Sequence, residues 1–303
     1  MTIPIILSTG SIYNLDISTI MAVAAEVGFA GIELVIDWRW ETHRLTHLES
    51  LMARYNLPIL AVHSPFLNMP IHGWPDDPVD RVKQSVRLAE ALGTRTIVVH
   101  PPERWVRLQA GIFGPSFSKR ISVPFPLSGP GPLGRWLWHD LADFQARTRV
   151  KITVENMPCR PFGPMSLEPH YYWKPSHLNH FQYLTFDTTH VGTRHKNLLL
   201  FYRQVKSKVA HIHLSNYNGQ EHQLLDDGDL PLAEFLRTLL ADNFCGLIAL
   251  ELNAFDLQAE DERALRQTLQ DNLAFCQNIL ASSDLSAEHL NSPRGTASPR
   301  GIK

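Results

Sequence analysis

The sequence predicts a single (β/α)8 barrel, and three observations support this prediction. Short runs of β-branched and aliphatic residues alternate eight times with longer segments of helical spacing, as in parallel β/α units. The chain has 303 residues, which is close to the ~250 residues typical of such a barrel. No change in composition marks a second domain, so one closed barrel is favoured over a doubly wound open sheet.

Eight segments are predicted to form the barrel strands, because each is short and rich in Ile, Val, Leu or Thr. They are residues 3–8, 31–36, 58–63, 95–100, 150–155, 183–187, 209–215 and 246–252. Helices are predicted at 17–27, 42–55, 78–92, 134–147, 195–206, 230–242 and 258–281, with a weakly marked one at 175–181. Asp16 and Asp77 are suited to begin helices. Gly28 and Gly93 are suited to end them.

Two connections and the C-terminal segment depart from this regular repeat. Residues 103–134, after the fourth strand, form a long loop rich in Gly, Pro and aromatic residues. A loop of that length in a compact domain usually serves as a lid or binding loop, and an insertion without a role is the alternative. Residues 157–175 follow the fifth strand on the same face. Residues 282–303 are polar and are predicted to be a disordered tail, which leaves 1–281 as the barrel domain.

The composition excludes several classes of protein. The formal net charge of -2 gives no bulk electrostatic reason to bind nucleic acid or an anionic membrane. The three cysteines are an odd and widely spaced set without a Cys-x-x-Cys pair, so they cannot make a disulfide framework. The N-terminus lacks the features of a signal peptide, and no apolar run is long enough to span a bilayer. We therefore expect a soluble, cytoplasmic protein, and leave open whether it forms a homo-oligomer.

Six consecutive predicted strands, the third to the eighth, end in a histidine or a carboxylate. These residues are His63, His100, Glu155, Asp187, His213 and Glu251. In a (β/α)8 barrel, reactive groups lie at the carboxyl ends of the strands. Small or β-branched residues two positions earlier share the inward face of the same strands. The pattern is typical of a packed barrel interior that opens into a polar site.

Four of these residues, Glu155, Asp187, His213 and Glu251, are predicted to bind a divalent metal ion. Three carboxylates brought together repel one another unless a cation holds them. Oxygen and imidazole ligands without cysteine favour Mn, Co, Mg or Zn over a thiolate metal. The alternative is that these residues are solvated strand ends or members of ordinary ion pairs.

Further histidines extend the predicted site. They are His63, His100, His190 and His222. His190 follows Asp187 by three residues where a strand meets a loop, and His222 lies in the loop after the seventh strand. We interpret the four together as substrate contacts or as ligands of a second metal. His211 shares a face with His213 but lies one layer deeper, so we expect it to be a hydrogen-bonded core histidine.

The motifs at these strand ends resemble the xylose-isomerase-like TIM-barrel superfamily. They are VHSPFLN, VVHPP, TVENMP, TFDTTH, HIHLSNYNG and ALELN, in this order. The superfamily contains sugar isomerases and epimerases together with the endonuclease IV family of abasic-site nucleases. The resemblance covers residues 3–281 and is specific for the fold and the metal site, and weak for the substrate.

Similarity to the sugar epimerases implies one Mn, Co or Mg ion. Its ligands fall on Glu155, Asp187, His213 and Glu251. The two glutamates would also move protons on either face of the substrate, and His190 would contact a sugar hydroxyl. Ketose 3-epimerases carry an arginine six residues after the metal histidine, where this chain has Gly219, so a specific ketose epimerase is unsupported.

Similarity to the endonuclease IV family implies three zinc ions. The ligands fall on His63, His100, Glu155, Asp187, His190, His213, His222 and Glu251. The ninth ligand is an aspartate where this chain has Gln220, although the neighbouring Glu221 is a possible substitute. The nuclease pattern also has a cysteine at the position of Thr189 and a different run after His213. These departures count against a repair nuclease.

The leading hypothesis is therefore a metal-dependent isomerase or epimerase of a small sugar or sugar derivative. The metal would act as a Lewis acid on a carbonyl and its neighbouring hydroxyl, with Glu155 and Glu251 as the acid and base and an enediolate as the intermediate. His190 is the third candidate catalytic residue, and His63, His100 and His222 are candidates for substrate binding. The alternative is zinc-dependent cleavage of abasic DNA, and a third possibility is a barrel that serves only as a binding module.

Aromatic residues in the two long connections are candidates for stacking on a sugar ring. They are Trp105, Phe113 and Phe117 in the first connection and Tyr171, Tyr172 and Trp173 in the second. The alternative for each is that it packs against the rim of the barrel.

Overall fold

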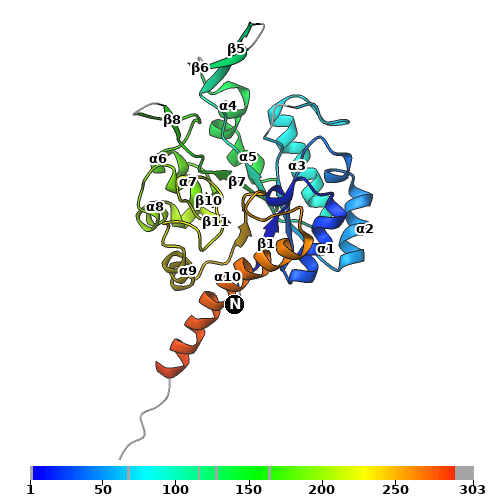
Figure 1. Cartoon of the computed structure of the whole chain (residues 1–303), viewed down its shortest axis with the longest axis vertical. Helices are drawn as coiled ribbons and strands as arrows, with labels where there is room; N and C mark the ends of the chain where they lie inside the picture. Colours follow the sequence, from blue (N-terminus) through cyan, green and yellow to red (C-terminus); the bar gives the residue numbers. More distant parts are fainter. Residues whose placement is uncertain (1–2, 67–68, 115–116, 127–128, 163–164, 291–303) are drawn as a thin grey trace, which may run out of the picture.

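A computed structural model describes residues 3–66, 69–114, 117–126, 129–162 and 165–290 (Figure 1). Eight parallel strands close into a barrel in the order β1-β12-β11-β10-β7-β4-β3-β2. These strands are β1 (Ile5–Ser8), β2 (Ile32–Val35), β3 (Ile59–His63), β4 (Thr96–Val99), β7 (Lys151–Glu155), β10 (Tyr183–Asp187), β11 (Val209–Leu214) and β12 (Leu247–Leu250). The predicted barrel is confirmed, and each of these strands lies within one of the eight predicted segments.

Helices surround the barrel and connect its strands. They are α1 (Ile17–Val27), α2 (Leu45–Tyr55), α3 (Pro78–Leu92), α4 (Gly131–His139), α5 (Leu141–Gln145), α6 (Pro175–Leu178), α7 (Thr188–Gly192), α8 (Leu198–Val205), α9 (Leu232–Ala241) and α10 (Glu262–Leu290). Three 3-10 helices are η1 (Thr9–Ile12), η2 (Trp40–Thr42) and η3 (Lys206–Lys208). The helix α1 ends at Gly28, whose φ of 96° lies in the left-handed region that glycine adopts without strain. Among the described residues, no helix is both long and apolar enough to cross a membrane.

The main hydrophobic core lies between the strands and the surrounding helices. Phe186 of β10 stacks on Phe235 of α9, with ring centroids 5.5 Å apart, and Tyr202 of α8 packs edge-on against both rings. All three side chains are buried. Helices cover the outer face of the strands, and the opposite strands cover the inner face. The strand sequences are therefore nearly continuous apolar runs.

The interior of the barrel changes from apolar to polar along the strands. A small apolar cluster is formed by Ile6, Ala61 and Ala249. Thr153 of β7 and Thr185 of β10 are buried, and their hydroxyl oxygens lie 2.6 Å apart. Alternate residues of a strand face the same side. Glu155, two residues after Thr153, and Asp187, two residues after Thr185, therefore also face the interior of the barrel. The barrel therefore opens into a polar site at the carboxyl ends of its strands.

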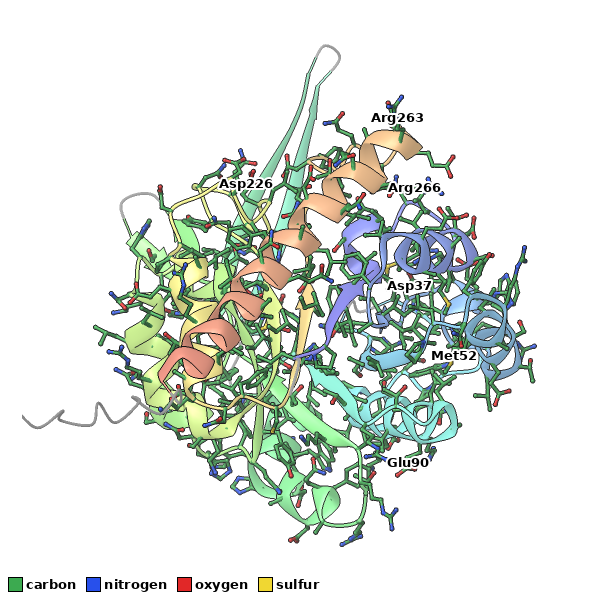
Figure 2. All side chains as sticks on the ribbon, turned by 90° about the horizontal axis from the view of Figure 1, so that it is seen from below. Asp37, Met52, Glu90, Asp226, Arg263 and Arg266 are labelled. Atoms are coloured by element: carbon green, nitrogen blue, oxygen red, sulfur yellow. The ribbon has the colours of Figure 1, made fainter. Side chains whose placement is uncertain are left out.

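The connection after β4 is long, as predicted, and it contains regular structure that the sequence did not reveal. Each of the two long connections contains an antiparallel hairpin: β5 (Trp105–Gly114) with β6 (Phe117–Pro126) in the first, and β8 (Arg160–Phe162) with β9 (Met165–Leu167) in the second. Figure 2 shows the β5–β6 hairpin projecting well beyond the barrel. The alternation of apolar residues from Val106 to Ile112 is the strand signal; the many Gly and Pro residues around it obscured that signal.

The last helix, α10, continues to Leu290, nine residues past the predicted end of the barrel at residue 281. In Figure 1 its final turns extend away from the barrel. Residues 291–303 lie outside the described part of the chain. The division into a barrel domain and a disordered tail therefore stays a prediction.

Asp77 illustrates how local sequence places the helices. Its carboxylate accepts hydrogen bonds from the backbone N–H groups of Val79 (2.9 Å) and Asp80 (3.0 Å) at the start of α3. We expect Asp77→Ala to lower the free energy of unfolding by about 1 kcal/mol, because an N-cap side chain is lost. Urea unfolding measures this change. Asp76→Ala is the control, since the Asp76 side chain is 93% exposed. An equal loss in both variants would contradict the role given to the cap.

Candidate metal centre and active site

The carboxyl ends of six barrel strands bring histidines and carboxylates together at one mouth of the barrel. These side chains are His63, His100, Glu155, Asp187, His213 and Glu251. Glu155, Asp187, His213 and Glu251, which we call the central group, have potential ligand atoms that all lie within 4.8 Å of one another. The four residues predicted to share a metal are therefore neighbours in space, although 96 positions of sequence separate the first from the last.

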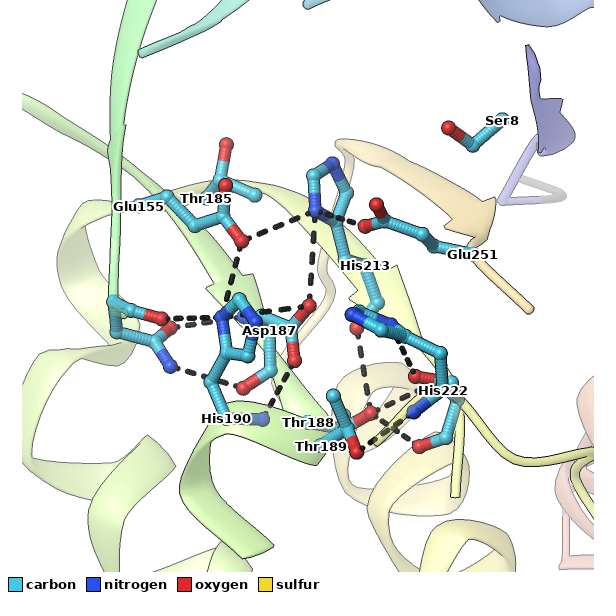
Figure 3. A network of polar contacts seen from close by, with 12 residues as sticks. Ser8, Glu155, Thr185, Asp187, Thr188, Thr189, His190, His213, His222 and Glu251 are labelled. Carbon is cyan, nitrogen blue, oxygen red and sulfur yellow. Dashed lines mark hydrogen bonds and ion pairs between the residues drawn. The ribbon is translucent and has the colours of Figure 1, made fainter. Parts of the chain in front are cut away.

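The imidazole of His213 lies at the middle of the central group (Figure 3). Its Nδ1 atom is 2.8 Å from Glu251 Oε2, 3.4 Å from Glu155 Oε1 and 3.8 Å from Asp187 Oδ2. Figure 3 shows the carboxylates of Glu155 and Glu251 on either side of this ring. Three acidic side chains from different strands thus surround one nitrogen atom.

Within the described part of the chain, three buried atoms of the central group have no partner in hydrogen-bond geometry. They are Glu155 Oε2, Asp187 Oδ2 and His213 Nδ1. The other carboxylate oxygen of Asp187 accepts a 2.8 Å hydrogen bond from the backbone N–H of His190. Polar atoms left unpaired in a protein interior are costly. Carboxylate oxygens and imidazole nitrogens are the donors that Mn, Co, Mg and Zn prefer, so these residues fit a divalent cation.

The pKa values at this site reflect burial opposed by charge. Burial raises the pKa of the Asp187 carboxyl to about 6, and the nearby Glu155 and Glu251 carboxylates act in the same direction. Burial also opposes ionisation of Glu251, but the positive charge of His213 outweighs it and lowers the pKa of Glu251 to about 2. For His190, burial disfavours the charged form, yet Asp187 and Glu155 raise its pKa to about 9. Protonated imidazoles thus supply positive charge that a divalent cation would replace.

A second group of possible ligands lies on the other side of Glu155. It consists of His63, His100 and Glu155. Glu155 Oε2 is 3.0 Å from His100 Nε2, which is 3.1 Å from His63 Nε2. His63 Nδ1 lies 2.9 Å from the carbonyl oxygen of Ser64; donation of its proton there leaves the lone pair on Nε2. The half-exposed ring of Phe66 covers both imidazoles, with centroids 5.2 and 4.8 Å away.

A third group is formed by Asp187, His190 and His222. His190 belongs to the short helix α7, which Asp187 caps. The backbone N–H of His222 donates to Thr189 Oγ1 (3.2 Å), and that hydroxyl donates to the Asn216 carbonyl (3.0 Å). Thr189, where the nuclease pattern has a cysteine, therefore holds the loop that carries His222 by hydrogen bonds.

Some predicted candidates lie outside these groups. Glu221 Oε1 accepts a 2.5 Å hydrogen bond from Arg160 and is in none of the metal-competent groups found in the described part of the chain. Tyr172 stacks on Trp138 with centroids 4.9 Å apart and donates to the Gly134 carbonyl, and Trp105 donates to the Glu168 carbonyl. Packing against the rim is thus the interpretation that fits Tyr172 and Trp105. The side chains of Phe113 and Phe117 lie outside the described residues.

Two residues of the site were missed by inspection of the strand ends. Asn156 exchanges hydrogen bonds with the backbone of Asp187 (2.9 and 3.0 Å), and its carbonyl oxygen lies 2.8 Å from His190 Nδ1. Its position directly after Glu155 was the available signal. Glu33 lies inside β2 and is completely buried beside His213. Its signal was a carboxylate between two apolar residues in a predicted strand.

Comparison with other sequences relates the chain to a known fold family. Residues 21–117 match the family model described as xylose isomerase-like TIM barrel. A protein of Mycobacterium leprae, described as uncharacterized, is 29% identical over 280 residues, which cover 90% of this chain and 96% of that protein. An uncharacterized protein of Mycobacterium tuberculosis is 28% identical with the same coverage.

Solved structures give the same result for the fold. The 3-keto-D-glucoside 4-epimerase from E. coli has a TM-score of 0.64 and 18% identity, covering 91% of this chain and 100% of its own. An L-ribulose 3-epimerase has a TM-score of 0.65 and 14% identity, covering 97% and 100%. An AP endonuclease of family 2 from Brucella melitensis has a TM-score of 0.58 and 15% identity, covering 85% and 97%. The chain therefore shares the barrel fold of these proteins, and its residues 21–117 are similar to the xylose isomerase-like TIM barrel family.

The resemblance predicted from the strand-end motifs is thereby confirmed. The structural neighbours of this chain include sugar epimerases and a nuclease-family protein. The matched segment, residues 21–117, ends before Glu155, the first residue of the central group. The assignment of a metal therefore depends on the geometry of the site itself.

Proposed function

We propose that this xylose isomerase-like barrel is a divalent-metal-dependent isomerase or epimerase of a small sugar or sugar derivative. The central group carries the proposal, because Glu155 and Glu251 approach the same imidazole nitrogen from different strands. Two carboxylates placed in this way suit removal of a proton on one face of a substrate and its return on the other. Structural neighbours that are themselves epimerases add support.

The residues that would hold the cation are Glu155, Asp187, His213 and Glu251. When bound, a divalent ion such as Mn, Co, Mg or Zn supplies Lewis-acid polarisation of a sugar carbonyl and its adjacent hydroxyl, which eases loss of the proton between them. The buried setting excludes water from this region, since Asp187 and His213 are fully buried and Glu155 is 1% exposed.

The protein's own side chains would carry the proton transfers. One glutamate takes the proton α to the carbonyl, and the electron pair of the broken C–H bond moves toward the carbonyl oxygen to form an enediolate of the sugar. The other glutamate returns a proton from the opposite face or at the neighbouring carbon. Glu251, with a side chain 23% exposed, lies nearer the mouth than Glu155. His190 would hydrogen-bond a sugar hydroxyl, and His63, His100 and His222 would bind the rest of the substrate.

Solvent isotope exchange tests this proposal directly. The protein, loaded in turn with Mn, Co, Mg or Zn, is incubated in deuterium oxide with a panel of ketoses, aldoses and their phosphates. We expect incorporation of one deuterium at the carbon next to the carbonyl of at least one sugar, together with conversion to its isomer or epimer. NMR and mass spectrometry measure both. Absence of exchange for every sugar with every metal would contradict the proposal.

A second candidate function is zinc-dependent cleavage of a phosphodiester in abasic DNA. The observation that favours it is the presence of two further groups of possible ligands, one around His63 and His100 and one around His190 and His222. It predicts two or three zinc ions per chain by metal analysis, cleavage of an abasic oligonucleotide, and binding that weakens steeply with salt. One ion per chain and no binding to abasic DNA would rule it out.

A further inference from the structure

We infer that Glu33 is a positioning residue that sets the orientation and tautomer of His213, so that Nδ1 of this imidazole faces the central group with its lone pair available. This inference rests on the proposed metal centre. It adds Glu33, which lies within a strand and not at its end. Glu33 belongs to β2, whereas the residues of the central group come from β7, β10, β11 and the end of β12. It contacts Nε2 of His213, and the central group faces Nδ1.

Glu33 is a fully buried carboxylate with unusual partners. Its Oε1 accepts a hydrogen bond from Ser8 Oγ (3.1 Å), and its Oε2 lies 2.7 Å from His211 Nε2 and 3.1 Å from His213 Nε2. In the part of the chain that the structure describes, it forms no ion pair with lysine or arginine. A buried carboxylate is costly without compensating contacts. The two imidazoles therefore supply what stabilises it.

The contact determines which nitrogen of His213 carries the proton. A carboxylate only accepts hydrogen bonds, so His213 Nε2 must donate to Glu33. In a neutral imidazole the lone pair then resides on Nδ1. This is the atom that lies 2.8 Å from Glu251 Oε2 and has no partner in hydrogen-bond geometry among the residues that the structure describes. Histidines that bind metals commonly donate their other N–H group to a carboxylate, which orients the ring and increases its basicity.

Glu33, His211 and His213 also have the spacing of metal ligands. In this trio, however, the atoms that face one another are already joined by hydrogen bonds, and both oxygens of Glu33 have partners. The central group instead retains two buried atoms, His213 Nδ1 and Asp187 Oδ2, that lie 3.8 Å apart and have no hydrogen-bond partner among the described residues. These two atoms favour a cation on the Nδ1 side of His213, with Glu33 as the support of the imidazole.

The inference is tested by metal binding in Glu33→Gln and Glu33→Asp variants. Apparent affinity for Co²⁺ and Zn²⁺ is measured by calorimetry and by the visible absorption of bound Co²⁺. We expect Glu33→Gln to bind about 10- to 100-fold more weakly, as for other residues that support a metal ligand. The glutamine side chain has no charge and only one oxygen that accepts hydrogen bonds, so it holds the Nε2–H groups of His211 and His213 less strongly. Glu33→Asp keeps the charge and is expected to recover part of the affinity.

Thr153→Val is the matched control, because Thr153 is as buried as Glu33, and its side-chain hydrogen bonds in the described part of the chain join Ile97 and Thr185 and not the central group. We expect this variant to keep wild-type affinity for the metal. A Glu33→Gln variant that binds as tightly as the wild type would overturn the inference. A wild-type protein that binds no divalent metal would overturn the proposed function and this inference with it.

A measurement on the wild-type protein tests the same inference without relying on the variants to fold. In zinc-loaded protein labelled with ¹⁵N-histidine, NMR should detect one histidine with Nε2–H retained, slow to exchange, and Nδ1 bound to the metal. Coordination of zinc through Nε2 of His213 would overturn the inference and assign the ion to the Glu33 side.

Discussion

The Glu155→Gln variant is expected to lose ~10²- to 10⁴-fold in kcat for isotope exchange, the range found when a general acid or base is removed. Glu155 Oε1 lies 3.2 Å from His190 Nδ1 and 3.4 Å from His213 Nδ1. Its other oxygen lies 3.0 Å from His100 Nε2. One side chain therefore faces both the central group and the second group of ligands. The amide has the same shape but no charge, so both proton transfer and metal binding should decline.

The measurement is kcat and KM for the sugar identified by isotope exchange, with metal content determined on the same samples. Glu90→Gln is the control, since Glu90 lies on the outer helix α3, labelled in Figure 2, and its carboxylate accepts a hydrogen bond from Thr148, far from the central group in sequence and on the outside of the barrel. We expect this variant to behave as the wild type. A folded Glu155→Gln variant with undiminished exchange would exclude Glu155 as the acid or base.

Metal binding is expected to raise the apparent Tm of chelator-treated protein by about 5–10 °C. A ligand present at 100 times its Kd stabilises the folded state by ~2.7 kcal/mol, and each kcal/mol shifts Tm by roughly 2–4 °C in a domain of this size class. The buried carboxylates of the central group give the effect its physical basis, because a cation removes their mutual repulsion. Differential scanning calorimetry with and without Mn, Co, Mg or Zn measures the shift.

The Asp187→Asn variant tests whether the stabilisation by metal depends on the charge of the Asp187 carboxylate. Asparagine is as good an N-cap as aspartate, so it should keep the 2.8 Å hydrogen bond to the backbone N–H of His190 that begins α7. The variant loses the charge of the buried Oδ2 atom that faces His213. We expect it to fold and to show little stabilisation by metal. An equal Tm shift in Asp187→Asn, or no shift in the wild type with any of the four metals, would contradict the proposed centre.

Much of the site could be predicted because a closed parallel barrel brings the ends of strands that are far apart in the sequence close together in space. Once eight strands are recognised from their apolar runs, their carboxyl ends must meet at one mouth. Glu155 and Asp187 could thus be placed together without coordinates, as could His63 and His100. The same logic located His211 one layer deeper, where it is buried and lies 2.7 Å from a carboxylate.

The sequence by itself determined the barrel, its strands and the strand ends that carry histidines and carboxylates, because these depend on local periodicity and on a closed topology. Only the tertiary structure decided which atoms face one another and which ring nitrogen is held by a partner. Glu33 shows why: it is 178 and 180 residues from the two histidines that it contacts. Local patterns contain no information about pairs so far apart, since such contacts are set by how β2 and β11 pack side chains into the same interior of the barrel.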